Sequence, residues 1–293
     1  MRVFANNRTG CVAALMVAAS LGIILRGTAH AQGATQPGPN AGALTFSGGL
    51  DVPTVYFFRG IRQESDAHLT LWPYGDVRIL LRSGEGGSRS LTANFGVWNS
   101  LNTGKSGSGG PLKKIHYQEN FYTGLRVGLG AGIGLTTTLT ARTSPNGGFQ
   151  TIRELDVAAS KGGRIAPYGL VAFELSSAGQ ADGGSKKGRY LEFGAGPNIG
   201  MFGKTRLTVP LKVGFSLKDY YELLGRDIKY HDSRFGFFEV GGLVTVPFMT
   251  GSQFGSWHLH GGASVLLLGD TTQAFNQGRS HQVVGLAGAG VAY

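Results

Sequence analysis

Apolar and polar residues alternate along most of the chain with the two-residue period of a β-strand. In residues 206–217, RLTVPLKVGFSL, every odd position from Leu207 to Leu217 is apolar, while Arg206 and Lys212 lie on even positions. Successive side chains of a strand point to opposite faces, so this segment has one apolar and one polar face. Because the pattern recurs throughout the chain and helical spacing does not explain it, it predicts an all-β protein.

About twelve segments follow this alternation and are separated by turn residues. Most have eleven or more residues, which exceeds a typical soluble strand and approaches the length that a tilted strand needs to cross a bilayer. Short glycine-rich turns alternate with long polar loops, as in outer-membrane barrels, whose short turns are periplasmic. The prediction is a transmembrane antiparallel β-barrel with strands at 44–60, 68–82, 88–100, 115–129, 132–143, 150–160, 164–176, 188–199, 205–217, 235–247, 256–268 and 281–293.

The N-terminus carries the features of a secretory signal peptide. Arg2 and Arg8 precede the apolar run CVAALMVAASLGIIL, and the sequence AHA forms a small-x-small cleavage site before Gln32. Export through such a signal predicts that the protein reaches the cell outer membrane. The predicted organisation is a cleaved signal peptide at 1–31, a flexible lead-in at 32–43 and a barrel domain at 44–293.

The composition excludes two other classes of protein. The chain has 50 glycines and 15% charged residues, and outside the signal it has no apolar run long enough for a membrane helix. Without the three arginines of the signal, 24 basic residues face 17 acidic ones, with no basic cluster that would indicate nucleic acid. The single cysteine, Cys11, is lost with the signal, so the mature chain contains no disulfide.

The last strand, VVGLAGAGVAY, ends in the aromatic Tyr293. A terminal strand with an aromatic last residue resembles the signal that the outer-membrane barrel assembly machinery reads. The expected partners are therefore outer-membrane lipid and lipopolysaccharide, with the barrel assembly machinery and periplasmic chaperones during biogenesis, and no nucleic acid.

The stretch VYFFRG at 55–60 ends an aromatic run on an arginine. If the first strand continues through it, Asp51 faces inward, and Tyr56 and Phe58 face lipid as part of an interfacial girdle. Burying arginine at the middle of a bilayer costs roughly 2 to 4 kcal/mol, so Arg59 is expected in the lumen or at the rim. A bulge at Pro53 would reverse this register.

This stretch also carries a family resemblance. DVPTVYFFRGIRQ resembles the hallmark near the first strand of the TorF family of outer-membrane porins, and recurring strand openings with glutamate extend the resemblance loosely over the mature chain. Arg62 departs from the family pattern, which has a small polar residue there. The resemblance implies an outer-membrane barrel with a transport role. The matched positions of its aromatic-x-Phe-Arg-Gly-x-x-Gln pattern are Tyr56, Phe58, Arg59, Gly60 and Gln63.

Charged residues of both signs are expected inside the barrel. Glu154, Glu192 and Glu239 precede alternating apolar faces and are expected to form one carboxylate layer near the extracellular end. Glu119 shares the parity of outward apolar neighbours, so either a bulge near Gly124 turns it inward, which is the favoured expectation, or it faces lipid. These charges form either an ion-pair network that plugs the barrel or a constriction that selects solutes. The candidate pore-lining or rim residues are Asp51, Arg59, Asp76, Arg78, Arg82, Glu119, Arg142, Glu154, Asp156, Arg164, Glu174, Glu192, Arg206, Lys212, Glu239, His258 and His260.

His258 and His260 lie one strand repeat apart and raise the alternative of a metal site or a catalytic base. No acidic, cysteine or serine partner lies near them in sequence, so hydrogen-bonded packing is expected, with no metal, no cofactor and no enzymatic activity. The tyrosine-rich loop at 218–234 has a short helical pattern and suits a constriction, a ligand contact or a solvated loop. The predicted function is a porin-like channel for small solutes or ions. The alternatives are a non-conducting barrel with an adhesion, scaffold or envelope-integrity role, and a barrel enzyme.

Overall fold

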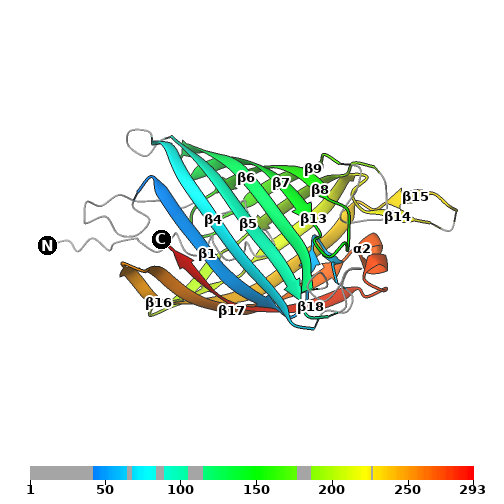
Figure 1. The fold of residues 1–293 in the computed structure, drawn as a ribbon. Coiled ribbons are helices and arrows are strands. Elements are labelled where there is room, and N and C mark those ends of the chain that lie inside the picture. The colour runs from blue at the N-terminus through cyan, green and yellow to red at the C-terminus, as the bar shows by residue number, and fades with distance from the viewer. Residues whose placement is uncertain (1–41, 65–67, 84–88, 105–114, 177–185, 226) are drawn as a thin grey trace.

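The strands wrap around one axis to form a closed antiparallel barrel (Figure 1). The predicted signal peptide and most of the predicted lead-in lie outside the described residues. The computed structural model describes residues 42–64, 68–83, 89–104, 115–176, 186–225 and 227–293.

Fourteen strand segments make up the twelve strands of the barrel, as the alternation predicts. Two strands are interrupted, at 196–197 and at 209–210, where Pro197 and Pro210 lack the N–H that a ladder requires. The barrel closes where the first strand pairs with the last, with Leu50 opposite Ala289. The segments are β1 Leu44–Pro53, β4 Thr70–Ser83, β5 Ser90–Asn102, β6 His116–Gly130, β7 Ile133–Thr143, β8 Ile152–Lys161, β9 Tyr168–Glu174, β10 Arg189–Ala195, β11 Asn198–Phe202, β12 Thr205–Thr208, β13 Leu211–Lys218, β16 Phe235–Ser252, β17 Gly255–Leu268 and β18 His281–Ala292.

The smaller elements belong to the long connections. The chain end at Tyr293 lies at one end of the barrel, whereas the helix α2 and the hairpin β14–β15 lie at the other (Figure 1). None of the helices in the described parts of the chain is long and apolar enough to span a membrane. The bounds are β2 Phe57–Phe58, β3 Ile61–Arg62, β14 Glu222–Leu224, β15 Tyr230–Asp232 and α2 Asp270–Phe275.

The outer surface of the barrel is apolar and its interior is largely polar. On β7 the outward residues Leu135 and Leu139 are exposed, while Thr136, Thr138 and Thr140 are buried inside. β-Branched threonines suit the pleated inner face, and the outward leucines would meet lipid. This alternation is the arrangement of a membrane-spanning β-barrel, with the outward apolar band and inward polar face that the sequence predicts.

If the outward apolar band lies in the bilayer, the cost of a charged substitution on it should depend on the depth of the residue in the membrane. Leu139 lies near the middle of β7 and Ile133 is its first residue, and both are exposed on the outer surface. Leu139→Arg is expected to lower the free energy of unfolding in lipid vesicles by roughly 2 to 4 kcal/mol, because it places a cation at the bilayer midplane. Ile133→Arg is the matched control and is expected to cost about 1 kcal/mol or less. Equal costs in urea unfolding would contradict this membrane placement.

Two predicted strands were too long. The alternation predicted a first strand over 44–60, but β1 ends at Pro53 and the following residues leave the barrel wall. The strand predicted at 164–176 likewise begins only at Tyr168, because 162–167 form the turn that precedes it. Because β1 ends at Pro53, the residues that follow it are free to enter the lumen and fill part of it.

Candidate functional site

The connection after β1 turns into the lumen and forms a short hairpin, residues 54–64, which we call the inner hairpin. Its strands β2 and β3 pair through Phe58 and Ile61. The two residues between them, Arg59 and Gly60, have φ values of 49° and 81°, the left-handed conformation of a two-residue hairpin turn. The inner hairpin therefore presents Arg59 at its tip.

The aromatic residues of the inner hairpin face the inside of the barrel, so the prediction of a lipid-facing girdle at Tyr56 and Phe58 was wrong. Tyr56 is 2% exposed and packs edge-on against Trp72 at a centroid distance of 5.1 Å, with Trp98 and Tyr117 close by. Edge-to-face pairs stabilise beyond their buried area. Packing against these rings buries the apolar surface of the inner hairpin inside the barrel. This burial stabilises the inward position more than contact with lipid would stabilise the outward one.

Arg59 is the centre of a buried ion-pair network. Its two terminal nitrogens donate to both oxygens of Glu154 at 2.6 and 2.9 Å, and one of them also lies 3.4 Å from Asp156. Arg142 donates to the same Glu154 carboxylate at 2.7 Å, and the Tyr220 hydroxyl lies 2.7 Å from Arg59. Bidentate arginine–carboxylate pairs are strong and directional. The tip of the inner hairpin is thereby fixed to β7 and β8.

The three glutamates expected to form one layer take different partners. Glu154 binds the arginines, whereas Glu192 accepts hydrogen bonds from the hydroxyls of Tyr168 and Tyr190 at 2.6 and 2.5 Å. The Tyr190 ring in turn lies 4.2 Å from the guanidinium of Arg59, a cation–π contact. The Tyr190 ring thus connects the Glu192 site to the Arg59 network.

The long connections at the α2 end of the barrel hold the backbone of the inner hairpin. The Tyr221 hydroxyl donates to the Arg59 carbonyl at 2.8 Å, and the Asn276 side chain, next to α2, donates to the Gly60 carbonyl at 2.7 Å. Asn276 also accepts from the Arg62 N–H at 2.9 Å. The helical pattern expected at 218–234 was wrong, because this loop contains the hairpin β14–β15. Its tyrosines at 220 and 221 nevertheless reach the lumen, as a constriction element would.

Most of the predicted candidates lie inside the barrel. The side chains of Arg59, Arg78 and Glu239 are 7%, 16% and 16% exposed. The candidates that are almost completely buried are Asp51, Asp76, Arg142, Glu154, Asp156, Glu174, Glu192, Arg206, Lys212, His258 and His260.

Three candidates do not face the lumen as expected. A register shift between Leu80 and Arg82 turns Arg82 out to an exposed position. Arg164 is exposed in the turn before β9. The pairing of β5 with β6 runs without interruption through Gly124, so the expected bulge is absent there and Glu119 keeps its outward orientation.

One of the two histidines, His260, has an acidic partner that the sequence did not reveal. His260 Nε2 lies 2.8 Å from Asp51 Oδ1, and the rings of His258 and His260 are 5.7 Å apart. Asp51 and His260 are brought together by the closure of β1 against β18 and β17, which joins residues 209 positions apart. Hydrogen-bonded packing accounts for His260, and within the described residues no group of three His, Cys, Asp or Glu side chains forms a metal site.

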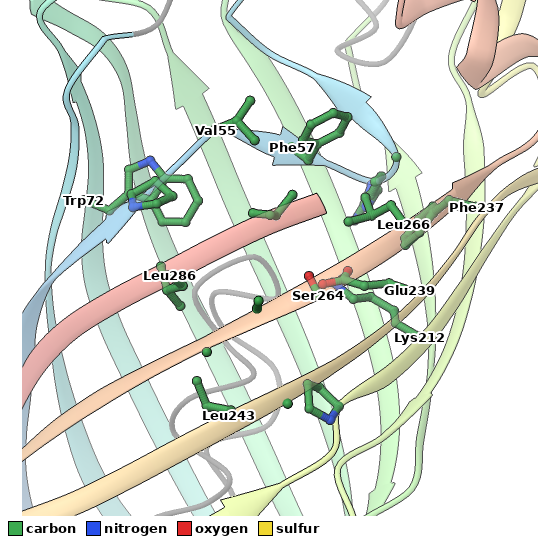
Figure 2. A pocket seen from close by; sticks show the side chains of 18 residues that line it. Val55, Phe57, Trp72, Lys212, Phe237, Glu239, Leu243, Ser264, Leu266 and Leu286 are labelled. Carbon is green, nitrogen blue, oxygen red and sulfur yellow. The ribbon is translucent and has the colours of Figure 1, made fainter. Parts of the chain in front are cut away.

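A cavity of about 90 Å³ lies between the inner hairpin and the wall formed by β16, β17 and β18 (Figure 2). Its charged residues are the pair Lys212 and Glu239, joined at 2.7 Å, and Arg59, which is bound to Glu154. The sequence placed Lys212 and Glu239 in the lumen without pairing them, and it did not reveal the apolar inward residues around them. The signal lay in β17 and β18, where runs such as SVLLL and VVGLAGAG are apolar on both faces. The apolar lining consists of Pro53, Val55, Phe57, Trp72, Pro210, Phe237, Leu243, Ala263, Leu266, Val284 and Leu286.

Comparison with known proteins finds barrels and no family. No family model and no curated protein matches the chain. An outer membrane channel from Pseudomonas putida F1 is 13% identical over 89% of this chain and 100% of its own, with a TM-score of 0.46. The NanC porin is 12% identical over 86% and 99% of the two chains, with a TM-score of 0.41. Escherichia coli outer membrane phospholipase A is 10% identical over 84% and 89%, with a TM-score of 0.42. At these values the similarity concerns the barrel architecture and nothing of the residues inside it.

Proposed function

We propose that this chain is an outer-membrane channel for the passive passage of small solutes or ions, with the inner hairpin as its constriction. The observation that carries the proposal is the cavity beside the inner hairpin, where the lumen cross-section is not filled by side chains. A barrel of twelve strands has a backbone diameter of roughly 24 Å. An inward segment that occupies part of this space leaves a path for small solutes only.

The charges at the cavity define the selectivity that we propose. Arg59 and Arg142 share the Glu154 carboxylate, so these charges largely compensate one another. Lys212 and Glu239 form the charged pair that lines the cavity itself. Charged side chains at a constriction set ion preference because they act at short range on the passing ion. Balanced charges of both signs favour a weakly selective channel.

The test of the channel is single-channel conductance of the refolded mature protein, residues 32–293, in a planar bilayer. Discrete and reproducible conductance steps are expected. A protein that migrates as a folded barrel and inserts, yet conducts no ions, would contradict the proposal. That outcome would favour the non-conducting barrel, for which the dense anchoring of the inner hairpin is the supporting observation.

Opposite substitutions in the cavity pair are expected to shift selectivity in opposite directions. Glu239→Gln removes the carboxylate that pairs with Lys212 at 2.7 Å and is expected to shift the channel toward anions, whereas Lys212→Gln is expected to shift it toward cations. The reversal potential under a tenfold KCl gradient measures this change. Glu119→Gln removes one outward carboxylate and is the matched control, expected to leave the reversal potential unchanged. Shifts of the same sign in both cavity variants would show that this pair does not line the path.

The proposal includes the export route expected from the sequence. A chain with this outward apolar band would be inserted by the barrel assembly machinery into the cell outer membrane, next to lipopolysaccharide. Fractionation of cells that express the full chain tests this localisation. Heat-modifiable migration of the protein in the outer-membrane fraction is the expected result.

A further inference from the structure

The inner wall of the barrel is apolar where the cavity lies against it, although the same two strands, β16 and β17, also bury Thr245, His258 and His260 in the lumen. On β7 and β8 the inward residues include Thr138, Thr140 and Glu154, all nearly fully buried and polar. On β16 and β17 the inward residues include Leu243 and Leu266, which line the cavity. The lumen of a water-filled barrel is polar throughout. An apolar inner wall is therefore a feature that a channel for hydrophilic solutes does not require.

Apart from Arg59, whose charge is paired with Glu154 and Asp156, the charged groups of the cavity are gathered on one side of it. In Figure 2 the ends of Lys212, Glu239 and Ser264 lie together, while Trp72 and Leu286 lie across the cavity from them. Pockets that bind small molecules combine an apolar lining with a few placed polar groups that orient the ligand. The cavity has this composition on a small scale.

The volume limits what the cavity can hold. An engineered cavity of roughly 150 Å³ binds benzene, which has six non-hydrogen atoms, so about 90 Å³ corresponds to roughly four. A four-carbon branched group fills this space. Sugars fit poorly, because their hydroxyl groups would lose water against the apolar wall without gaining hydrogen bonds.

We propose that this cavity binds small solutes with a branched aliphatic body and one polar group, the aliphatic part against β16–β18 and the polar group at Lys212 and Glu239. This specificity rests on the channel function proposed above. In the intact protein the two charges compensate each other, so a neutral hydroxyl group is accepted more readily than either a carboxylate or an ammonium group. Without Glu239, Lys212 would favour a solute with a carboxylate. Without Lys212, Glu239 would favour a solute with an ammonium group.

The test uses three probes that share an isobutyl body: isobutanol, isovalerate and isobutylamine. Saturation-transfer NMR of the refolded barrel in detergent micelles measures the affinity of each probe. We expect saturable binding that is tightest for isobutanol. In Glu239→Gln the preference for isovalerate over isobutylamine is expected to rise at least tenfold, and in Lys212→Gln to fall at least tenfold, because unit charges this close interact strongly at protein dielectric values.

Two controls keep the test decisive if a single charge removal impairs folding. Ser264→Phe fills the cavity and is expected to abolish saturable binding, whereas Val265→Phe, which points outward on the same strand, is expected to leave it intact. The double variant Lys212→Glu with Glu239→Lys retains a pair and is expected to keep the neutral preference. Binding that survives in Ser264→Phe reports partition into the micelle and would overturn the inference.

Conductance measured on the same preparations separates the two proposals. A conducting barrel without saturable probe binding overturns the solute class and leaves the channel standing. A silent barrel that binds isobutanol in the cavity overturns the channel and with it the role of this site in passage.

Discussion

Replacing Arg59 by glutamine is expected to raise the single-channel conductance severalfold and to destabilise the protein. The Arg59 side chain binds Glu154 through both terminal nitrogens, approaches Asp156 and contacts the Tyr220 hydroxyl. A neutral amide cannot replace these bonds and leaves two buried carboxylates with Arg142 as their remaining cation. Removing one partner from a buried ion pair costs about 3 to 5 kcal/mol. The inner hairpin would then leave its position and widen the lumen.

Arg62→Gln is the matched control for this variant. Arg62 lies on the same hairpin. Among the described residues, the hydrogen bond seen for its side chain is the one that it donates to the Glu64 carbonyl at 2.7 Å. It is expected to keep the conductance of the unaltered protein. In Arg59→Gln, trypsin should gain access to the peptide bond after Arg62, which mass mapping of fragments detects. Unchanged conductance together with an uncleaved hairpin would show that Arg59 does not hold the constriction.

The barrel was predictable because its determinants are local. Alternation in single strands such as β7 and β13 reveals the outward apolar face, and the same parity places Arg142, Glu154 and Lys212 inside. Each of these inferences needs only the period of a strand and the cost of placing charge in lipid. The number of strands follows from the turns between them.

The inner hairpin was not predictable, because its determinants are distant in sequence. The segment VYFFRG continues the alternation of the first strand, so its pattern alone favours the barrel wall. Its actual position depends on Tyr56 meeting Trp72 and Trp98, and on Arg59 meeting Glu154 95 residues later. The turn at Arg59 and Gly60 also lacks the Asn-Gly or Asp-Gly pair that marks such hairpins. A pattern confined to one strand contains none of this information.

Strand register, which the sequence does not reveal, explains the differences at Arg82 and Glu119. The shift after Leu80 reverses Arg82, and no residue there marks the shift in the sequence. Conversely, Gly124 suggested a bulge to accommodate Glu119, but that glycine stays in register because its Cβ position is occupied by Asn94 and Thr138 of the neighbouring strands. A glycine required by close packing and a glycine required by a bulge look the same in one sequence.

Gly60→Val is expected to displace the inner hairpin through steric clash and backbone strain, without removing a charge. Gly60 has a φ of +81°, and a Cβ added there would lie 2.9 Å from the Phe237 ring. A β-branched residue in the left-handed region is a true outlier. The backbone strain is expected to destabilise the protein by roughly 1 to 2 kcal/mol, and overpacking against Phe237 by about 1 to 3 kcal/mol more. The variant should show higher conductance, a lower urea midpoint and tryptic cleavage after Arg62, with Gly60→Ala intermediate.

Gly75→Val separates this effect from the general cost of adding valine to the barrel. Gly75 lies on β4, where an added Cβ meets no heavy atom within 4 Å and φ is not positive. Its conductance and trypsin pattern should therefore match those of the unaltered protein.

If Gly60→Val behaved like Gly75→Val, the contact between Gly60 and Phe237 would not hold the hairpin. If Gly60→Val lost stability without gaining conductance, the hairpin would be structural packing, and the path for solutes would lie elsewhere in the lumen. Agreement between Gly60→Val and Arg59→Gln would assign the constriction to the hairpin's position, because the two variants share no chemical change other than its release.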